Sequence, residues 1–378
     1  MTDPRAQKLF EIAKQSLLGN IVEIENQKFL VAGQNQFKTL WTRDFCHSIR
    51  GLVAIGQQDV ACSHAQYLLN HLREDGLVPR VVDNHLVQFR VAWQSARTLL
   101  TFLPGLKFQA PLKAQYIDEH GSNAMDSNVL LILGALQLGD QFWQRNESKL
   151  KTVWNWYQGK FHGGLLQQSA FSDWQDTTRR QGRTFLMNLL YFLAAARLQK
   201  KGWNLDLDLT AYKETLQRTF LRDGVYLSQE GYDVVSVEAH LLALESPEFL
   251  SDTEKEQLWL NLKKHPLITL DGAIGRCSYP DWPSKDLAWH IKVAQLKNYH
   301  GSITWSWIAG LGLKVARLMK DPAMIQKQLD HLEFLLSEGE VLEVYDPYRN
   351  LKPWRSWLLS SEHPFSWGAG YVAEALKS

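Results

Sequence analysis

The chain has 378 residues, 45% of them hydrophobic, and its 41 basic and 40 acidic side chains give a net charge of +1. The two signs are interspersed, so the sequence has neither the basic stripe of a nucleic-acid-binding protein nor the polybasic run of a membrane-surface protein. Three cysteines without metal-ligand spacing exclude a disulfide framework and predict no metal site. Residues 1–15 lack the apolar stretch of a signal peptide, and no apolar run is long enough to cross a bilayer, so we expect a cytoplasmic protein.

Helical hydrophobic patterns separated by turn signals run from end to end of the chain. In chain order they cover residues 4–18, 44–57, 59–73, 93–103, 126–139, 143–158, 184–200, 209–221, 234–245, 252–264, 302–319, 322–337 and 366–377. Two β-like patches remain: residues 77–91, which read as a hairpin that turns at Asp83–Asn84, and residues 341–345. Without a strand series, linker or low-complexity tract, we predict one all-α domain over residues 1–378.

Loops that carry polar motifs fall at alternate junctions between these helices. In a closed ring of inner and outer helices, alternate junctions share one face. An open solenoid would instead show a fixed-period repeat, which this sequence lacks. We therefore expect the helices to close into a ring that gathers distant polar loops around one pocket.

The 15 tryptophans are more than core packing demands, because a buried indole N–H needs a hydrogen-bond partner. Sugar rings combine apolar CH faces with hydroxyl groups, and flat amphipathic side chains suit them. Packing in the core explains most tryptophans one by one. Those beside polar motifs indicate a saccharide pocket.

Two carboxylates, a tryptophan and two arginines lie together in residues 172–180, before the helix predicted from Thr184. An aspartate desolvated beside an indole has a raised pKa, which suits a general acid. Glu343 lies in a short apolar run, where an unpaired ionised glutamate is rare. It either pairs with Arg349 or Arg355 or serves as a general base. Taken one at a time, both motifs are better explained by capping, solvated charges or ion pairing.

Further loops place aromatic beside polar side chains at predicted helix starts. They are residues 41–45, 123–127, 299–307 and 362–368. Each one alone is explained by capping and packing, and Asp126 fits an N-cap. Their joint recurrence favours a saccharide pocket.

Taken in order, these motifs resemble those of the (α/α)6 catalytic domains of glycogen-debranching-type amylo-α-1,6-glucosidases. More distantly they resemble processing α-glucosidases, neutral invertases and trehalases. The matching stretches are Trp41–Asp44 with W-x-R-D, Asp75–Pro79 with D-G-L-I-P, Asn123–Ser127 with N-A-x-D-A/S, Trp174–Asp176 with W-M-D, Arg180–Arg183 with R-x-G-K, Tyr299–Trp305 with Y-H-x-G-x-x-W, Leu342–Asp346 with S-E-I-F-D/E-N-Y, and Ser366–Trp367 with the last aromatic loop. The resemblance implies an (α/α)6 toroid of the six-hairpin glycosidase type with a small β-hairpin insertion.

The resemblance also implies an inverting glycoside hydrolase of the α-glucosidase type that acts on a small α-glucoside or oligosaccharide without a cofactor. The W-M-D match selects Asp176 over Asp173 as general acid, and Glu343 becomes the general base. The implied substrate-binding residues are Trp41, Arg43, Asp44, Asp126, Trp174, Arg180, His300, Trp305 and Trp367.

Two departures from the family pattern bear on the substrate. Leu186 replaces a carboxylate that would point toward the pocket, and the chain has no room for the N-terminal β-rich domain of the debranching enzymes, which argues against a long branched glucan. Two alternatives stay open: a sugar epimerase on the same toroid that uses paired histidines such as His300 and His363, and a non-catalytic saccharide-binding protein. The linkage cleaved, the aglycone and the oligomeric state stay open as well.

Overall fold

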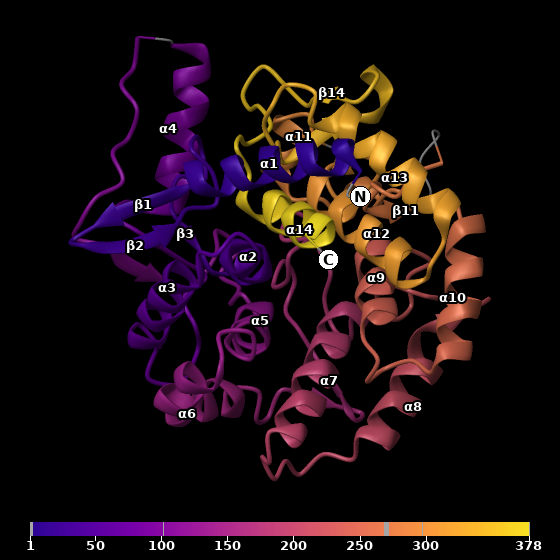
Figure 1. Cartoon of the computed structure of the whole chain (residues 1–378). Helices are drawn as coiled ribbons and strands as arrows, with labels where there is room; N and C mark the ends of the chain where they lie inside the picture. The colour runs from indigo at the N-terminus through magenta and orange to yellow at the C-terminus, as the bar shows by residue number, and fades with distance from the viewer. Residues whose placement is uncertain (1–2, 101, 268–271, 297, 378) are drawn as a thin grey trace.

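The computed structural model describes residues 3–100, 102–267, 272–296 and 298–377 of a mostly helical chain with small sheets. Among these residues, no helix combines the length and apolar character that a bilayer crossing requires. The helices lie in two layers, an inner ring and an outer one (Figure 1).

The inner helices form a closed circuit of neighbours in the described part of the chain. α2 (Thr42–Ala54) packs against α5 (Asp126–Ala135), α5 against α7 (Phe185–Lys200), α7 against α9 (Val237–Glu245), α9 against α12 (Ser306–Leu318), α12 against α14 (Ser366–Lys377), and α14 against α2. Figure 1 shows the C-terminal helix α14 returning beside α2, so the chain closes the ring with its last element. At this closure a Cβ on Gly51 would lie 2.5 Å from the Cα of Gly370, so glycine allows the two backbones to touch.

An outer helix covers each inner one. α1 (Pro4–Gly19) packs on α14, α3 (Gln58–Asn70) on α2, α6 (Asp140–Asn155) on α5, α8 (Leu209–Phe220) on α7, α10 (Asp252–Lys264) on α9, and α13 (Pro322–Leu335) on α12. The inner helix α7 is enclosed on nearly every side, so it is largely apolar around its circumference, and every residue from 185 to 196 is buried. The outer helix α8 buries only Tyr212, Leu216 and Phe220, one face at a spacing of four.

Short antiparallel strands connect the helices. The three-stranded sheets are β3 (Leu40–Trp41) with β4 (Val81–Asp83) and β5 (Lys113–Gln115), and β12 (Thr304–Trp305) with β13 (Val344–Asp346) and β14 (Lys352–Pro353). The two-stranded sheets are β1 (Ile21–Ile24) with β2 (Gln27–Leu30), β6 (Phe161–His162) with β7 (Leu165–Leu166), β8 (Leu221–Arg222) with β9 (Val225–Tyr226), and β10 (Val235–Ser236) with β11 (Ser278–Tyr279). Strands β3, β10 and β12 lead directly into inner helices, so these pairings fix the loops at the helix N-termini.

The prediction of a hairpin over residues 77–91 is wrong. Val81–Asp83 is the middle strand β4, and α4 (Val87–Leu99) occupies the second half of the expected hairpin. Arg90 of α4 donates to both carboxylate oxygens of the buried Asp83, at 2.5 and 2.6 Å. Asp83 is therefore the buried partner of a helix residue and not the tip of a turn. The remaining short elements are α11 (Trp289–Val293) and the 3-10 turns η1 (Ser284–Asp286) and η2 (Pro347–Arg349).

Candidate active site

A cavity of about 590 Å³ lies where the N-termini of several inner helices meet. Trp41 precedes α2, Trp305 precedes α12 and Trp367 is in the first turn of α14, and all three line it. Most of the side chains expected at the site reach its wall. They are Trp41, Arg43, Asp44, Trp174, Asp176, His300, Trp305, Glu343 and Trp367. The structure thus brings Asp176 and Glu343, which are far apart in the sequence, to one cavity.

Asp176 is held by two arginines. Its Oδ2 accepts hydrogen bonds from Arg43 Nη1 at 3.0 Å and from Arg80 Nη2 at 3.2 Å. Burial by itself would raise the pKa of Asp176, but the guanidinium groups of Arg43 and Arg80 outweigh burial and leave the pKa below its usual value. The indole beside Asp176 was expected to raise this pKa, and the structure corrects that argument because the nearby positive charges together outweigh the effect of burial.

Glu343 lies in a different electrostatic environment. Its Oε1 accepts a short hydrogen bond from the Tyr299 hydroxyl, and its Oε2 accepts one from the backbone N–H of Glu362 at 3.3 Å. Burial raises the pKa of Glu343 to about 8, although the Tyr299 hydrogen bond opposes the shift. Among the described residues Glu343 has no ion pair. Arg349, one of its two expected partners, lies with its Nε 3.7 Å from Asp346 Oδ2 instead.

Asp126 lies behind the cavity wall. It is buried and binds Arg43 through two hydrogen bonds, Nε to Oδ2 at 2.6 Å and Nη2 to Oδ1 at 3.1 Å. The expectation that Asp126 lines the pocket is therefore corrected: it is in contact with Arg43, which in turn reaches the cavity and Asp176.

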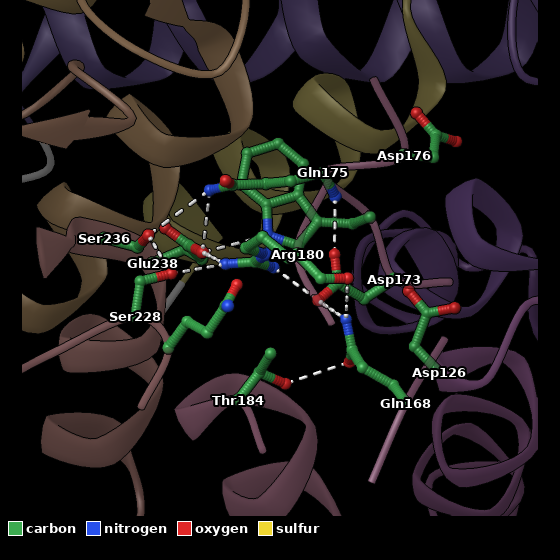
Figure 2. A network of polar contacts seen from close by, with 12 residues as sticks. Asp126, Gln168, Asp173, Gln175, Asp176, Arg180, Thr184, Ser228, Ser236 and Glu238 are labelled. Atoms are coloured by element: carbon green, nitrogen blue, oxygen red, sulfur yellow. Dashed lines mark hydrogen bonds and ion pairs between the residues drawn. The ribbon is translucent and has the colours of Figure 1, made fainter. Parts of the chain in front are cut away.

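Arg180 is also buried away from the cavity, at the centre of the network in Figure 2. Its Nη2 lies 2.7 Å from Asp173 Oδ2, and its Nη1 donates to Ser228 Oγ at 2.8 Å and lies 3.7 Å from Glu238 Oε1. Figure 2 shows Asp176 apart from these contacts. Arg180 was expected to bind substrate, but the structure makes it a buried support for the loop that carries Trp174 and Asp176.

Trp174 connects this network to the cavity. Its Nε1 donates to Glu238 Oε1 at 3.0 Å, and burial raises the pKa of Glu238 to about 7. The ring of Trp174 makes edge contacts with four aromatic neighbours. These are His300, Trp305, Trp307 and Trp367, at centroid distances of 4.9 to 5.7 Å. The apolar wall is therefore fixed by ring packing on one side and by a hydrogen bond to a buried carboxyl group on the other.

The two histidines proposed for an epimerase do not meet. His300 lines the cavity, stacks on Trp305 and contacts Thr177 Oγ1 through Nδ1 at 2.7 Å. Burial lowers the pKa of His300 to about 3, so the ring is neutral near pH 7. His363 is exposed and lies 3.1 Å from Glu340 Oε2, away from the lining residues. This pair therefore cannot act as acid and base on one sugar.

Three residues of the site were not predicted. Arg80 follows the Asp75–Pro79 motif directly, and its position beside that motif was the available signal. Tyr299 and Glu362 lie inside motifs that were noted for their aromatic neighbours.

Leu186 is buried in α7 within the core and does not reach the described cavity wall.

Comparisons with known proteins support the fold. No protein-family model and no curated protein matches the chain. A GH63 mannosylglycerate hydrolase from Thermus thermophilus matches 98% of this chain and 99% of its own, with 13% sequence identity and a TM-score of 0.63. A glycosidase in complex with glucose matches 99% of this chain and 98% of its own, with 12% identity and a TM-score of 0.66. A rhamnosidase from Klebsiella oxytoca with rhamnose bound matches 99% of this chain and 64% of its own, with 11% identity and a TM-score of 0.64. The chain thus spans 64% of the rhamnosidase but nearly all of the other two. The chain shares its fold with glycosidases, and at these identities the likeness carries the fold alone.

Proposed function

We propose that the ring of paired helices is an (α/α)6 toroid and that the protein is an inverting glycoside hydrolase for a small glycoside. One observation carries the proposal: Asp176 and Glu343 both line a single cavity walled by Trp41, Trp174 and Trp305. Inverting hydrolysis needs two carboxyl groups roughly 6.5–9.5 Å apart, with the sugar and a water molecule between them. The cavity volume of about 590 Å³ is typical of small-molecule sites and supports a short substrate over a long glucan.

In this mechanism Asp176 protonates the leaving oxygen and Glu343 removes a proton from the attacking water. The hydrogen bonds from the Tyr299 hydroxyl and from the Glu362 backbone N–H fix the position of the Glu343 carboxylate, the group that takes the proton from water. Asp176 presents Oδ1, the oxygen that the two arginines do not contact through these hydrogen bonds. Arg43 and Asp44, at the start of α2, would bind the sugar hydroxyls.

A second assignment exchanges the two roles, and the pKa shifts favour it. A pKa of about 8 keeps Glu343 protonated at neutral pH, as a general acid requires, and the lowered pKa keeps Asp176 ionised, as a general base requires. Both assignments use the same two carboxyl groups across the same cavity. They differ in which variant loses acid assistance to the leaving group.

The test compares Asp176→Asn and Glu343→Gln on methyl α-glucoside, whose leaving group needs protonation, and on α-glucosyl fluoride, whose leaving group needs little. We expect Asp176→Asn to lose about 10²–10⁴-fold on the methyl glucoside but much less on the fluoride. Glu343→Gln should lose activity on both, and azide should rescue it on the fluoride by forming a glucosyl azide of inverted configuration. The opposite pattern supports the exchanged roles, and near-normal rates in both variants would overturn the proposal.

The sugar and the linkage require a substrate screen with the product anomer followed by NMR. The screen contains α-glucosides, trehalose and sucrose, which the sequence motifs suggest. Mannosylglycerate and rhamnosides are added because the proteins of similar fold include a mannosylglycerate hydrolase and a rhamnosidase. Release of a monosaccharide with inverted anomeric configuration is the expected result.

A further inference from the structure

Three side chains with metal-binding atoms converge at one edge of the cavity, apart from the two proposed catalytic carboxylates. Glu119 and His120 follow β5, and His290 belongs to α11. Each offers one ligand atom, and the three atoms all lie within 4.8 Å of one another. Glu119 and His290 line the cavity and are about one-third exposed, so an ion can reach the cluster from solvent.

The contacts within the cluster are too long for direct hydrogen bonds. Glu119 Oε1 lies 3.9 Å from His120 Nε2 and 3.8 Å from His290 Nε2. The Nε2 atom of His120 is buried and has no hydrogen-bond partner among the described residues. The two imidazole rings are nearly parallel, 5.7 Å apart with 20° between their planes. The three ligand atoms therefore lie close together without hydrogen bonds between them.

These distances are close to those of a zinc site. Zinc bonds of 2.0–2.1 Å in tetrahedral geometry put neighbouring ligand atoms about 3.4 Å apart. The two contacts of Glu119 with the histidines, at 3.9 and 3.8 Å, therefore have to close by roughly 0.5 Å, and the two histidine nitrogens lie within 4.8 Å of each other. Two imidazoles and one glutamate form a known zinc ligand set with a fourth position left for a solvent or substrate oxygen. Imidazole ligands also favour a transition metal over calcium or magnesium, which prefer sites made of oxygens.

We propose that Glu119, His120 and His290 bind one divalent transition-metal ion of the zinc class at the edge of the cavity. Sequence spacing indicated no metal because His290 is far from Glu119 and His120 along the chain and joins them only in the folded protein. The ion ties the short helix α11 to the loop after β5, and both segments contribute to the cavity wall.

The cluster is also connected to the proposed catalytic carboxylates. Glu119 Oε2 lies 3.5 Å from Arg80 Nη1, while Arg80 Nη2 donates to Asp176 Oδ2 at 3.2 Å. An ion on Oε1 competes with Arg80 for the negative charge of Glu119. Metal binding thus acts on Asp176 through Arg80, without contact between the ion and Asp176.

Metal binding by the full-length chain tests the proposal directly and does not depend on any hydrolase activity. After treatment with a chelator, we expect calorimetry to show one zinc ion per chain and cobalt(II) to give the visible absorption bands of a low-coordinate site. His290→Ala and His120→Ala should each weaken zinc binding by at least about 100-fold, beyond the 10–100-fold typical of changes outside the ligand set. Zinc should raise the Tm of the parent protein but not of these variants.

His363→Ala is the matched control, because it removes a surface histidine that pairs with Glu340 outside the cluster. It should bind zinc like the parent protein. A Tm of metal-free His290→Ala equal to that of the metal-free parent shows that the variant is folded. Failure to bind one zinc ion, or equal affinity in His290→Ala, His363→Ala and the parent protein, would overturn the proposal while leaving the proposed hydrolase function untouched.

Discussion

Arg43 and Asp126 form a two-point ion pair inside the ring, with Nε to Oδ2 at 2.6 Å and Nη2 to Oδ1 at 3.1 Å. The pair connects the first turn of α2 to the first residue of α5, its neighbour in the ring. Because a guanidinium group is planar, fixing two of its nitrogens also fixes the third. Arg43 Nη1 is thereby directed at Asp176, at 3.0 Å. Asp126 thus sets the position of a charge that Asp176 depends on.

Asp126→Ala should therefore lower both stability and activity. It leaves Arg43 as a buried charge without its two-point partner, a change that typically costs about 3–5 kcal/mol in free energy of unfolding. Urea unfolding measures this loss, and kcat on the substrate found in the screen measures the effect on Asp176. Arg43→Lys keeps the charge but not the planar fork, so we expect lower kcat with a smaller loss of stability. A change in unfolding free energy below about 0.5 kcal/mol for Asp126→Ala would contradict this role.

Trp174→Phe should destabilise the protein by about 1–3 kcal/mol while keeping an aromatic wall. The variant removes the indole N–H that donates to Glu238 Oε1 at 3.0 Å. Glu238 is fully buried, and its Oε2 already has no hydrogen-bond partner in the described part of the chain. Thermal and urea unfolding of the variant provide the measurement.

A double-mutant cycle with Glu238→Leu, which removes the acceptor oxygen, isolates the contact. If the hydrogen bond joins the two side chains energetically, the double variant is more stable than the sum of the two single losses predicts. Strict additivity of Trp174→Phe and Glu238→Leu would show that the loss comes from ring packing and not from this bond.

The helices could be predicted from sequence because their signals are local. The inner helix α7 is largely apolar on all sides, and the outer helix α8 shows one buried face, so the hydrophobic pattern reveals both helices. The start of α9 was placed at residue 234, but Val235–Ser236 pairs with Ser278–Tyr279 and the helix begins at Val237. That pairing joins segments distant in the chain, and no local pattern reveals it.

The site was only partly predictable for the same reason. Ordered motifs placed Asp176 and Glu343 on what the structure shows to be one cavity wall. The direction of the Asp176 pKa shift could not be predicted, because it depends on where Arg43 and Arg80 lie after folding. Motif matching also could not separate Asp126, which lies behind Arg43, from residues that line the cavity.

Glu343→Gln should stabilise the protein more at pH 8 than at pH 5. Burial raises the pKa of Glu343 from 4.5 to about 8, so the folded chain keeps a proton that the unfolded chain releases above about pH 4.5. The free energy of unfolding of the parent protein therefore falls as the pH rises from about 4.5 to about 8. The fall is roughly 1.4 kcal/mol per pH unit in this range. Glutamine does not titrate and removes this dependence.

Urea unfolding at both pH values provides the measurement. Glu340→Gln, a change at an exposed carboxylate paired with His363, is the control and should not alter the pH dependence in this way. Asp44 and Glu362 also have pKa values raised to about 7 by burial, so a residual fall in stability with pH is expected in Glu343→Gln. An equal effect of Glu343→Gln at pH 5 and pH 8 would mean that Glu343 is ionised in the folded protein at both values.

Asp173 and Asp176 lie three positions apart in one loop, and their substitution should separate stability from activity. Asp173 is buried and binds Arg180 Nη2 at 2.7 Å, Gln168 Nε2 at 2.8 Å and the backbone N–H of Gln175 at 3.0 Å. Asp173→Asn weakens a buried ion pair, so we expect a loss of a few kcal/mol in unfolding free energy, of the order found for broken buried pairs. Asp176 is 20% exposed at the side chain and lines the cavity, so Asp176→Asn should reduce kcat with a smaller change in stability.

Because both variants exchange a carboxylate for an amide of the same size, parallel urea unfolding and kcat measurements compare position alone. A large loss of kcat in a stable Asp173→Asn protein, with normal kcat in Asp176→Asn, would move the catalytic role to Asp173.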